Sequence, residues 1–327
     1  CHFSTVHQPF DVRIFVRECG SLAKAGYEVH LVIGAPKDEL KDGIHVHKIP
    51  RFSSRILRMT IAPWLALRKI LKIRAEIYHY HDPELIWLGF LLRWVFGKRV
   101  VFDIHESVYR QLQSKKYLPG PLGILAGTSF MLVERLLTVG QKKVVANEAS
   151  VGEHRNPVLV QNFPRQYEVE ASLDRFSPNH VPLIVYVGSL TEIRGAMEYL
   201  QLAKMLKANR RKFRMAVIGR IGTKTLENRM RAQIEADGLG EVVSLLGRQP
   251  WEQAMQTVAD ASIGLCLLHP VPNYTTCLAT KIIEYMMLGT PVLASDFDCW
   301  RRYVEGEQVG RMVDPLDVDS VYRVCTE

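Results

Sequence analysis

Residues 183–218 read LIVYVGSLTEIRGAMEYLQLAKMLKANRRKFRMAVI, and this stretch decides the fold class of the chain. Its first five residues, Leu183–Val187, are branched or aromatic and predict a buried β-strand. A helical pattern then covers Gly195–Asn209, and a second apolar run, Phe213–Ile218, predicts another strand. A strand, a helix and a strand in this order indicate two parallel strands joined by a crossover helix.

The same alternation of strands and helices extends in both directions from this stretch. Toward the C-terminus it predicts helices Thr225–Ala236, Trp251–Ala259 and Thr280–Leu288, and strands Val242–Leu245, Ile263–Leu268 and Pro291–Ala294. Toward the N-terminus it predicts strands Tyr27–Ile33, Ile44–Ile49, Ile77–Tyr80, Arg99–Asp103, Lys143–Ala146 and Val158–Val160, and helices Val12–Ala25 and Glu84–Phe96. Gly26 and Gly97 follow the two helices, where glycine readily forms the left-handed C-terminal residue.

The alternation is interrupted once, which divides the chain into two domains. The polar stretch 162–182 contains Pro164, Pro178 and Pro182 and has no hydrophobic period. A length of 327 residues also favours two domains. We therefore expect an α/β protein with two Rossmann-like, doubly wound parallel-sheet domains, residues 1–163 and 182–327, joined by a linker over 164–181. Ligands of such sheets bind at the carboxyl ends of the strands, so the domains should face a central cleft.

The composition is that of a globular protein, with 47% hydrophobic and 23% charged residues. No apolar run reaches the ~20 residues that span a bilayer, and no signal-peptide pattern is visible, so we expect a cytoplasmic protein. Six scattered cysteines without a C-x-x-C pair predict free thiols. The net charge of +8 implies an anionic partner. Because the positive charge is mostly dispersed and not interleaved with aromatic residues, we expect no nucleic-acid partner.

Several motifs resemble one enzyme family over nearly the whole chain. VYVGSLTEIRG (185–195), TKIIEYMMLGTPVLASD (280–296) and GRMVDP (310–315) resemble the nucleotide-sugar half of glycosyltransferase family 4, a retaining group with the GT-B fold. HQPFDVRI (7–14), HYHDPEL (79–85) and VFDIHE (101–106) resemble a bacterial branch that builds surface polysaccharides. The resemblance implies transfer of a hexose or N-acetylhexosamine from a UDP-sugar to a glycan or lipid-linked acceptor. The first domain would bind the acceptor and the second the donor.

A nucleotide diphosphate requires cations and free backbone N–H groups, and the second domain offers both. Arg194 follows a strand, and Lys281 lies just inside a predicted helix N-terminus, where unpaired N–H groups favour an anion. The resemblance implies that Glu284 binds the ribose; Thr276 stands where many members carry a further glutamate. In the alternative interpretation, Arg194 and Lys281 are ordinary surface cations, and Glu284 only forms an i, i+3 ion pair with Lys281. The predicted donor-binding residues are Gly188, Ser189, Arg194, Arg248, Leu278, Ala279, Thr280, Lys281 and Glu284.

The predicted catalytic residue is His105, directly after the strand Arg99–Asp103. The resemblance implies that its imidazole hydrogen-bonds the donor sugar and polarises the reacting centre; the alternative is a histidine satisfied at a strand end. The neighbouring Glu106 is a weaker candidate. The residues on the acceptor side are His7, Asp11, Arg13, His81 and Asp82, which either bind the acceptor or shape the loop.

A metal site is the competing interpretation of the polar residues in the first domain. His79, His81, Asp82, His105 and Glu106 are residue types that bind zinc or manganese. However, no further ligand follows at helical spacing, and the resemblance implies no tightly bound metal. We therefore expect no metal site and no tightly bound cofactor, with the nucleotide sugar as a co-substrate.

The segment 55–74 predicts attachment to an anionic membrane surface. Pro63 begins a helix in which Arg68, Lys69 and Lys72 lie on one arc. Trp64, Leu67, Ile70 and Leu71 lie on the other arc, and Leu65 intrudes on the basic one. A basic amphipathic helix with Trp and Leu suits a lipid headgroup interface, which would place the protein on the inner face of the cytoplasmic membrane. In the alternative, compatible interpretation, the apolar arc packs on the sheet.

Two other functions remain open from the sequence. A nucleotide-sugar 2-epimerase of the GT-B fold would share the pyrophosphate site but need no acceptor. A non-catalytic nucleotide- or NAD-binding protein is disfavoured because no G-x-G-x-x-G follows the first strand.

Overall fold

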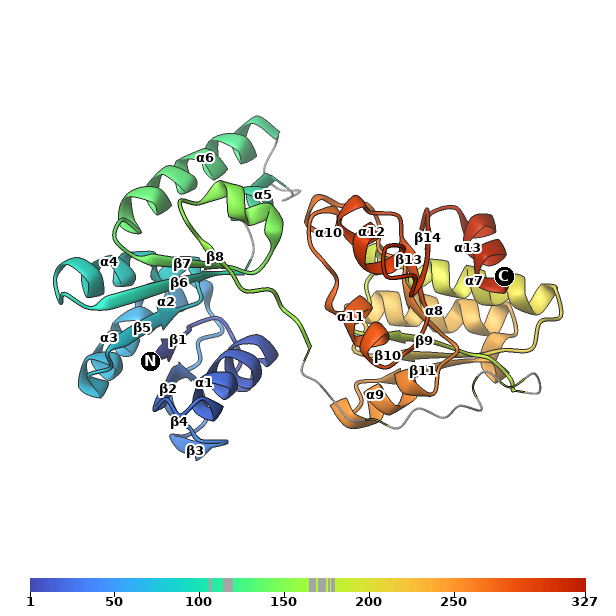
Figure 1. Cartoon of the computed structure of the whole chain (residues 1–327), viewed down its shortest axis with the longest axis horizontal. Coiled ribbons are helices and arrows are strands. Elements are labelled where there is room, and N and C mark those ends of the chain that lie inside the picture. Colours follow the sequence, from blue (N-terminus) through green and yellow to red (C-terminus); the bar gives the residue numbers. More distant parts are fainter. Residues whose placement is uncertain (106–107, 114–119, 165–168, 170–174, 176, 178–179) are drawn as a thin grey trace. The chain divides into compact units, whose positions relative to one another are not determined.

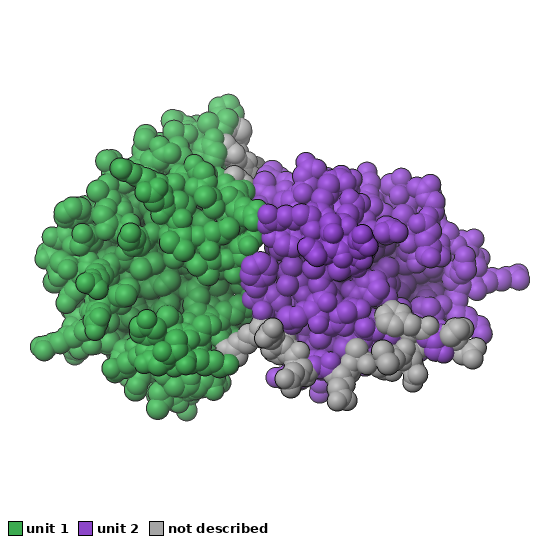
Figure 2. Space-filling model, in the orientation of Figure 1, with its two compact units in different colours: residues 1–162 green, residues 163–327 purple. Residues whose placement is uncertain are grey.

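The computed structural model describes residues 1–327 except 106–107, 114–119, 165–168, 170–174, 176 and 178–179. The chain divides into two compact units, residues 1–162 and 163–327 (Figure 2). Most of the expected linker lies outside the described residues. Arg175 within it is buried and donates to the carbonyl oxygens of Leu288 (3.4 Å) and Gly289 (2.9 Å), so this part of the segment packs on the second unit.

The first unit contains an eight-stranded sheet in the order β3-β4-β2-β1-β5-β6-β7-β8. Its strands are β1 (His2–Phe3), β2 (Val29–Gly34), β3 (Glu39–Lys41), β4 (Ile44–Ile49), β5 (Ile77–Tyr80), β6 (Arg99–Ile104), β7 (Lys142–Val145) and β8 (Val158–Leu159). Its helices are η1 (Val12–Cys19), α1 (Gly20–Lys24), α2 (Arg55–Thr60), α3 (Ala62–Ile73), η2 (Pro83–Leu85), α4 (Ile86–Trp94), α5 (Val108–Gln113), α6 (Gly120–Leu137) and η3 (Glu148–Glu153).

Helices cover both faces of this sheet because both faces of its strands are apolar (Figure 1). On β2, Val32 packs with Ile70 of α3, whereas its neighbours Leu31 and Ile33 pack with Ile14 of η1 on the opposite face. All of these side chains are fully buried. Alternating side chains of one strand therefore contribute to two separate cores.

The second unit contains a six-stranded parallel sheet in the order β11-β10-β9-β12-β13-β14. Its strands are β9 (Leu183–Val187), β10 (Arg214–Ile218), β11 (Val243–Gly247), β12 (Ile263–Cys266), β13 (Val292–Ser295) and β14 (Gly310–Val313). Its helices are η5 (Glu192–Arg194), α7 (Ala196–Ala208), α8 (Lys224–Ala236), η6 (Leu239–Glu241), α9 (Trp251–Ala259), α10 (Pro272–Thr275), α11 (Thr280–Met287), α12 (Asp298–Val304) and α13 (Val318–Thr326).

In each sheet the order in which successive strands are added reverses at one place, called here the reversal point, and this place positions the site. Counted within its own unit, the second sheet has the order 3-2-1-4-5-6, and the central six strands of the first sheet, β4-β2-β1-β5-β6-β7, have the same order. In such sheets the crevice for ligands opens at the carboxyl ends of strands 1 and 4. These are β1 and β5 in the first unit and β9 and β12 in the second.

The structure differs from the sequence-based expectation in the first unit. β3 pairs antiparallel with β4 at the sheet edge, through a turn at Asp42 (φ 51°) and Gly43 (φ 76°). An Asp-Gly pair is a strong hairpin signal, but β3 is too short and polar to show a strand pattern. The helix expected over Val12–Ala25 begins as a π-helix and continues as α1. Among the described residues, no helix is long and apolar enough to cross a bilayer.

Candidate active site

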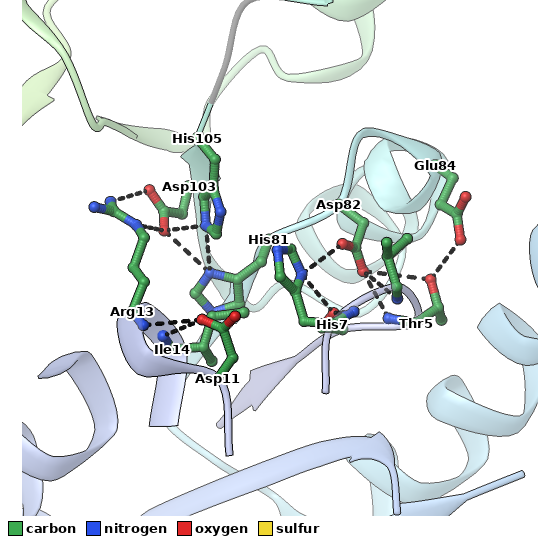
Figure 3. A network of polar contacts seen from close by, with 12 residues as sticks. Thr5, His7, Asp11, Arg13, Ile14, His81, Asp82, Glu84, Asp103 and His105 are labelled. Atoms are coloured by element: carbon green, nitrogen blue, oxygen red, sulfur yellow. Dashed lines mark hydrogen bonds and ion pairs between the residues drawn. The ribbon is translucent and has the colours of Figure 1, made fainter. Parts of the chain in front are cut away.

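Polar side chains converge at the reversal point of the first sheet. Residues 4–7 follow β1, His81 and Asp82 follow β5, and His105 follows β6. Figure 3 shows these side chains, with those of η1, in one network. The carboxyl ends of neighbouring parallel strands meet at one edge of the sheet, which brings together residues that are far apart in the sequence.

The carboxylate of Asp103 is the centre of this network, and it is fully buried. Its Oδ2 lies 2.8 Å from His105 Nε2 and 3.0 Å from His81 Nδ1. Its Oδ1 accepts from Arg13 Nη2 at 2.7 Å. Burial alone would raise the pKa of Asp103, but the hydrogen bonds from His105 and His81 hold it well below its usual range. An ionised carboxylate therefore orients the His105 ring, whose side chain is 21% exposed.

A second carboxylate, Asp82, organises the loop after β1. Its Oδ2 accepts from the backbone N–H of Thr5 at 2.6 Å, and its Oδ1 lies 3.1 Å from His7 Nδ1. Burial lowers the pKa of His7, but the hydrogen bond and charge of Asp82 outweigh it and the net shift is upward. The ring of His7 lies 4.9 Å from that of His105, measured between centroids. This part of the site therefore places a histidine whose pKa is raised by a carboxylate next to the predicted catalytic residue.

The π-helix η1 brings Arg13 and Glu18 onto one face. Asp11 caps its N-terminus by accepting from the N–H groups of Arg13 (2.9 Å) and Ile14 (3.1 Å). The backbone N–H of Val16 donates to Asp11 O at 3.2 Å, a spacing of five residues. Residues five apart then point the same way, and Arg13 Nε lies 3.0 Å from Glu18 Oε1. Burial, followed by the charge of Asp103, raises the pKa of Glu18 to about 9.

The structure thus brings all the residues predicted for the acceptor side into contact with the surroundings of His105. Asp11 shapes the loop, Arg13 and His81 hold Asp103, and His7 and Asp82 form a pair. Asp103 and Glu18 were not predicted as site residues from the sequence. The two-residue spacing of Asp103 and His105 was a usable signal, because it places both on one face of a strand. Glu106 lies outside the described residues.

The predicted donor site of the second unit is built around the loop after β9. Arg194 donates from Nη1 to the backbone oxygen of Ser189 at 2.9 Å and from Nε to Tyr274 Oη at 3.0 Å. Gly188 has φ +136°, and a Cβ there would lie 3.5 Å from Lys281 Nζ. The backbone of Gly219 is so close that a Cβ on it would lie 1.9 Å from Gly188 O. Glycine is therefore required at both positions.

Lys281 extends from the first turn of α11 toward this loop, with its Nζ 3.8 Å from the centroid of the buried Tyr186 ring. Ala279 is the N-cap of α11 and makes no side-chain cap hydrogen bond. The N-terminal N–H groups of α11 and two cations therefore lie near the reversal point of the second sheet. Leu278, Ala279 and Thr280 form the turn that leads into this helix, and Glu284 lies one turn further along it.

Arg248 is exposed and follows β11, the edge strand that β10 separates from β9, so it does not lie at the reversal point. The described interactions include none between Arg248 and the other predicted donor residues. Its role in donor binding stays a prediction. Thr276, in place of the family's further glutamate, donates its hydroxyl to Pro272 O at 2.9 Å and so stabilises α10.

Two groups of side chains in the first unit have the chemistry of metal ligands. One contains His2, Glu18, His79 and His81, and the other contains His81, Asp103 and His105; in each group the ligand atoms lie within 4.8 Å of one another. The expectation of no metal rested on the lack of a further ligand at helical spacing and on the family resemblance. The structure adds two residues that the sequence did not suggest, His2 from β1 and Glu18 from the π-helix.

The sequence matches two family models that together cover most of the chain. Residues 12–154 match "Glycosyltransferase Family 4", and residues 172–324 match "Glycosyl transferases group 1". No curated protein matches the sequence significantly.

Solved structures of glycosyltransferases share the fold at low identity. A sucrose-phosphate synthase from Thermosynechococcus elongatus is 18% identical, with 99% of this chain and 88% of that chain covered and a TM-score of 0.74. WaaG, a glycosyltransferase involved in lipopolysaccharide biosynthesis, is 16% identical over 99% and 88%, with a TM-score of 0.68. Anabaena HepE in complex with UDP is 14% identical over 99% and 88%, with a TM-score of 0.69. With both halves matched and two parallel-sheet domains present, the chain is a glycosyltransferase of the family 4 type with the GT-B fold.

Proposed function

We propose that this enzyme transfers a hexose or N-acetylhexosamine from a UDP-sugar, with retention of configuration, to a glycan or lipid-linked acceptor in cell-surface polysaccharide biosynthesis. The observation that carries the proposal is the His105 imidazole held by the buried, ionised Asp103 at the reversal point of the first sheet. A transfer step with an oxocarbenium-like sugar requires oriented polar groups near the reacting centre. We propose that no tightly bound cofactor takes part in this step.

The donor class follows from the cations of the second unit. Arg194 and Lys281 lie at the loop after β9 and the N-terminus of α11, where a diphosphate would gain charge-assisted hydrogen bonds. HepE structures contain UDP or UDP-glucose, which supports a uridine donor. We place the ribose at Glu284.

Release of UDP tests the proposal against the epimerase alternative. Purified enzyme incubated with UDP-glucose, UDP-galactose or their N-acetyl forms should release UDP only when a glycan or lipid-linked acceptor is present. NMR of the product should show the anomeric configuration of the donor. Conversion of the donor without an acceptor would favour the epimerase, and an inverted product would refute retention.

We further propose that segment 55–74 attaches the enzyme to the inner face of the cytoplasmic membrane. The apolar arc of α3 packs on the sheet through Leu67 and Ile70, whereas Trp64 is 54% exposed, unlike its predicted place in the buried arc. Preceding helix α2 exposes Ile56, Leu57 and Met59. Arg55 on α2 and Arg68 and Lys72 on α3 are also exposed, whereas Lys69 pairs with Asp38 at 3.2 Å.

Changing Arg55, Arg68 and Lys72 together to glutamine should lower binding to phosphatidylserine-containing vesicles about tenfold in ~0.1 M salt, because each cation near an anionic surface contributes roughly 1 kcal/mol before screening. Co-sedimentation measures this. The matched control changes Arg210, Arg211 and Lys212, which are exposed in the second unit, and should bind as the wild type does. Equal loss in both variants, or no binding by the wild type at low salt, would refute membrane attachment through this segment.

A further inference from the structure

We propose that His2, Glu18, His79 and His81 bind one divalent transition-metal ion of the zinc class, which fixes the π-helix η1 to the sheet. This goes beyond the proposed function, since the transfer step has been assigned to other residues and no bound metal. The ion would have a structural role: it would link η1 to strands β1 and β5, close to the residues that surround His105.

The sheet itself aligns the three histidines. His2 on β1 and His79 on β5 are register partners in adjacent parallel strands, and His81 is two residues beyond His79 on the same face. The ring centroids of His2 and His79 lie 4.5 Å apart, and those of His79 and His81 lie 4.7 Å apart. Three imidazoles from two strands therefore form a preorganised set, to which η1 adds the carboxylate of Glu18.

The distances between ligand atoms fit a small tetrahedral ion. His2 Nδ1 lies 3.1 Å from His81 Nε2 and 3.9 Å from Glu18 Oε2. Zinc–nitrogen bonds of roughly 2.0–2.1 Å separate tetrahedral ligands by about 3.3–3.5 Å. These two separations bracket that value, and all four ligand atoms lie within 4.8 Å of one another.

Neighbouring residues orient these ligands as they do in known zinc sites. His81 Nδ1 lies 3.0 Å from Asp103 Oδ2, so an Nδ1–H donated to Asp103 leaves the Nε2 lone pair directed toward His2. Arg13 pairs with Glu18 Oε1 at 3.0 Å and leaves Oε2 on the side of the histidines. A carboxylate that holds the far nitrogen of a ligating histidine is typical of metal sites.

The cluster also contains buried polar atoms that an ion would satisfy. Among the described residues, His79 Nε2 and both carboxylate oxygens of Glu18 are buried without a hydrogen-bond partner, although Glu18 has its ion pair with Arg13. Buried polar groups without partners are costly and require an explanation. The other metal-like group, His81, Asp103 and His105, is a weaker candidate because both carboxylate oxygens of Asp103 already have hydrogen-bond partners, Arg13 on Oδ1 and the two histidines on Oδ2.

Metal analysis of the enzyme tests the proposal independently of transferase activity. Protein made without a polyhistidine tag and purified without chelator should contain about one zinc or other divalent transition-metal ion per chain by mass spectrometry. After removal of the metal with a chelator, addition of Co²⁺ should give the visible absorption of tetrahedral cobalt, saturating at the same stoichiometry. Zn²⁺ should raise the melting temperature of the stripped protein by mass action.

Glu18→Gln and His79→Gln should each abolish the cobalt spectrum, and circular dichroism should confirm their fold. The control is His47→Gln, because His47 belongs to a separate histidine stack with His30 on β2 and β4, and it should bind cobalt as the wild type does. If the substituted proteins do not fold, the titration of the stripped wild type decides. A wild type that neither retains metal nor gives the cobalt spectrum refutes the site while leaving the proposed transferase function intact.

Discussion

His105→Ala should lower turnover by about 10²–10³-fold while leaving the affinity for UDP within about twofold, as expected for a group that stabilises charge at the reacting sugar. The imidazole is held at 2.8 Å by the ionised Asp103, and it belongs to the first unit, whereas the predicted diphosphate contacts belong to the second. Steady-state kinetics with the best UDP-sugar and acceptor, and calorimetry with UDP, measure the two quantities separately.

The matched control for this variant is His30→Ala. His30 also pairs with an acid, with its Nε2 3.1 Å from Glu28 Oε1, but it lies near the beginning of β2 and not at a carboxyl end. Its replacement should leave turnover almost unchanged. Near-normal turnover of His105→Ala would refute the catalytic role, and an equal loss in both variants would indicate damage to the fold.

Arg194→Ala and Lys281→Ala should each weaken UDP binding by about 10–150-fold, because each removes charge-assisted hydrogen bonds of about 1.5–3 kcal/mol to the diphosphate. The two cations approach the loop after β9 from η5 and α11, and Arg194 is held in place by Tyr274 and the Ser189 carbonyl. Isothermal titration calorimetry with UDP and with uridine separates the diphosphate from the base, since uridine affinity should change little.

Arg231→Ala serves as the control for the donor site. Arg231 is exposed on α8 and pairs with Glu227 at 2.9 Å, so its loss removes a positive charge without touching the proposed site. UDP affinity should then stay as in the wild type. If Arg194→Ala and Lys281→Ala also bind UDP normally, the diphosphate binds elsewhere.

Buried strands were predictable because their signal is local. Ile44–Ile49, Ile77–Tyr80 and Leu183–Val187 begin and end where their apolar residues predict. The edge strand β3 was not predictable, because it buries little apolar surface and its conformation depends on its pairing with β4. The π-helix was also missed, because the hydrophobic period of Val12–Ala25 agrees with an ordinary helix, and the Asp11 cap alone does not reveal the wider turn.

Site residues were predictable where a motif marks a strand end, as at His81 and His105. Their partners were not, because they depend on contacts over long separations in the sequence. Arg13 meets Asp103 across 90 residues, and Arg194 meets Tyr274 across 80. From the sequence, Asp103 was only the last residue of a buried strand. The structure shows that its carboxylate contacts Arg13, His81 and His105.

The close approach of Gly188 and Gly219 limits which residues can stand at the loop after β9. Any side chain at Gly219 would collide with the backbone of the neighbouring loop. No other residue type should therefore be accepted at this position. If the donor binds at this loop as proposed, a change of nucleotide sugar would have to come from side chains around the glycine pair. Deep mutational scanning of the second unit should therefore show residues 188 and 219 among its intolerant positions.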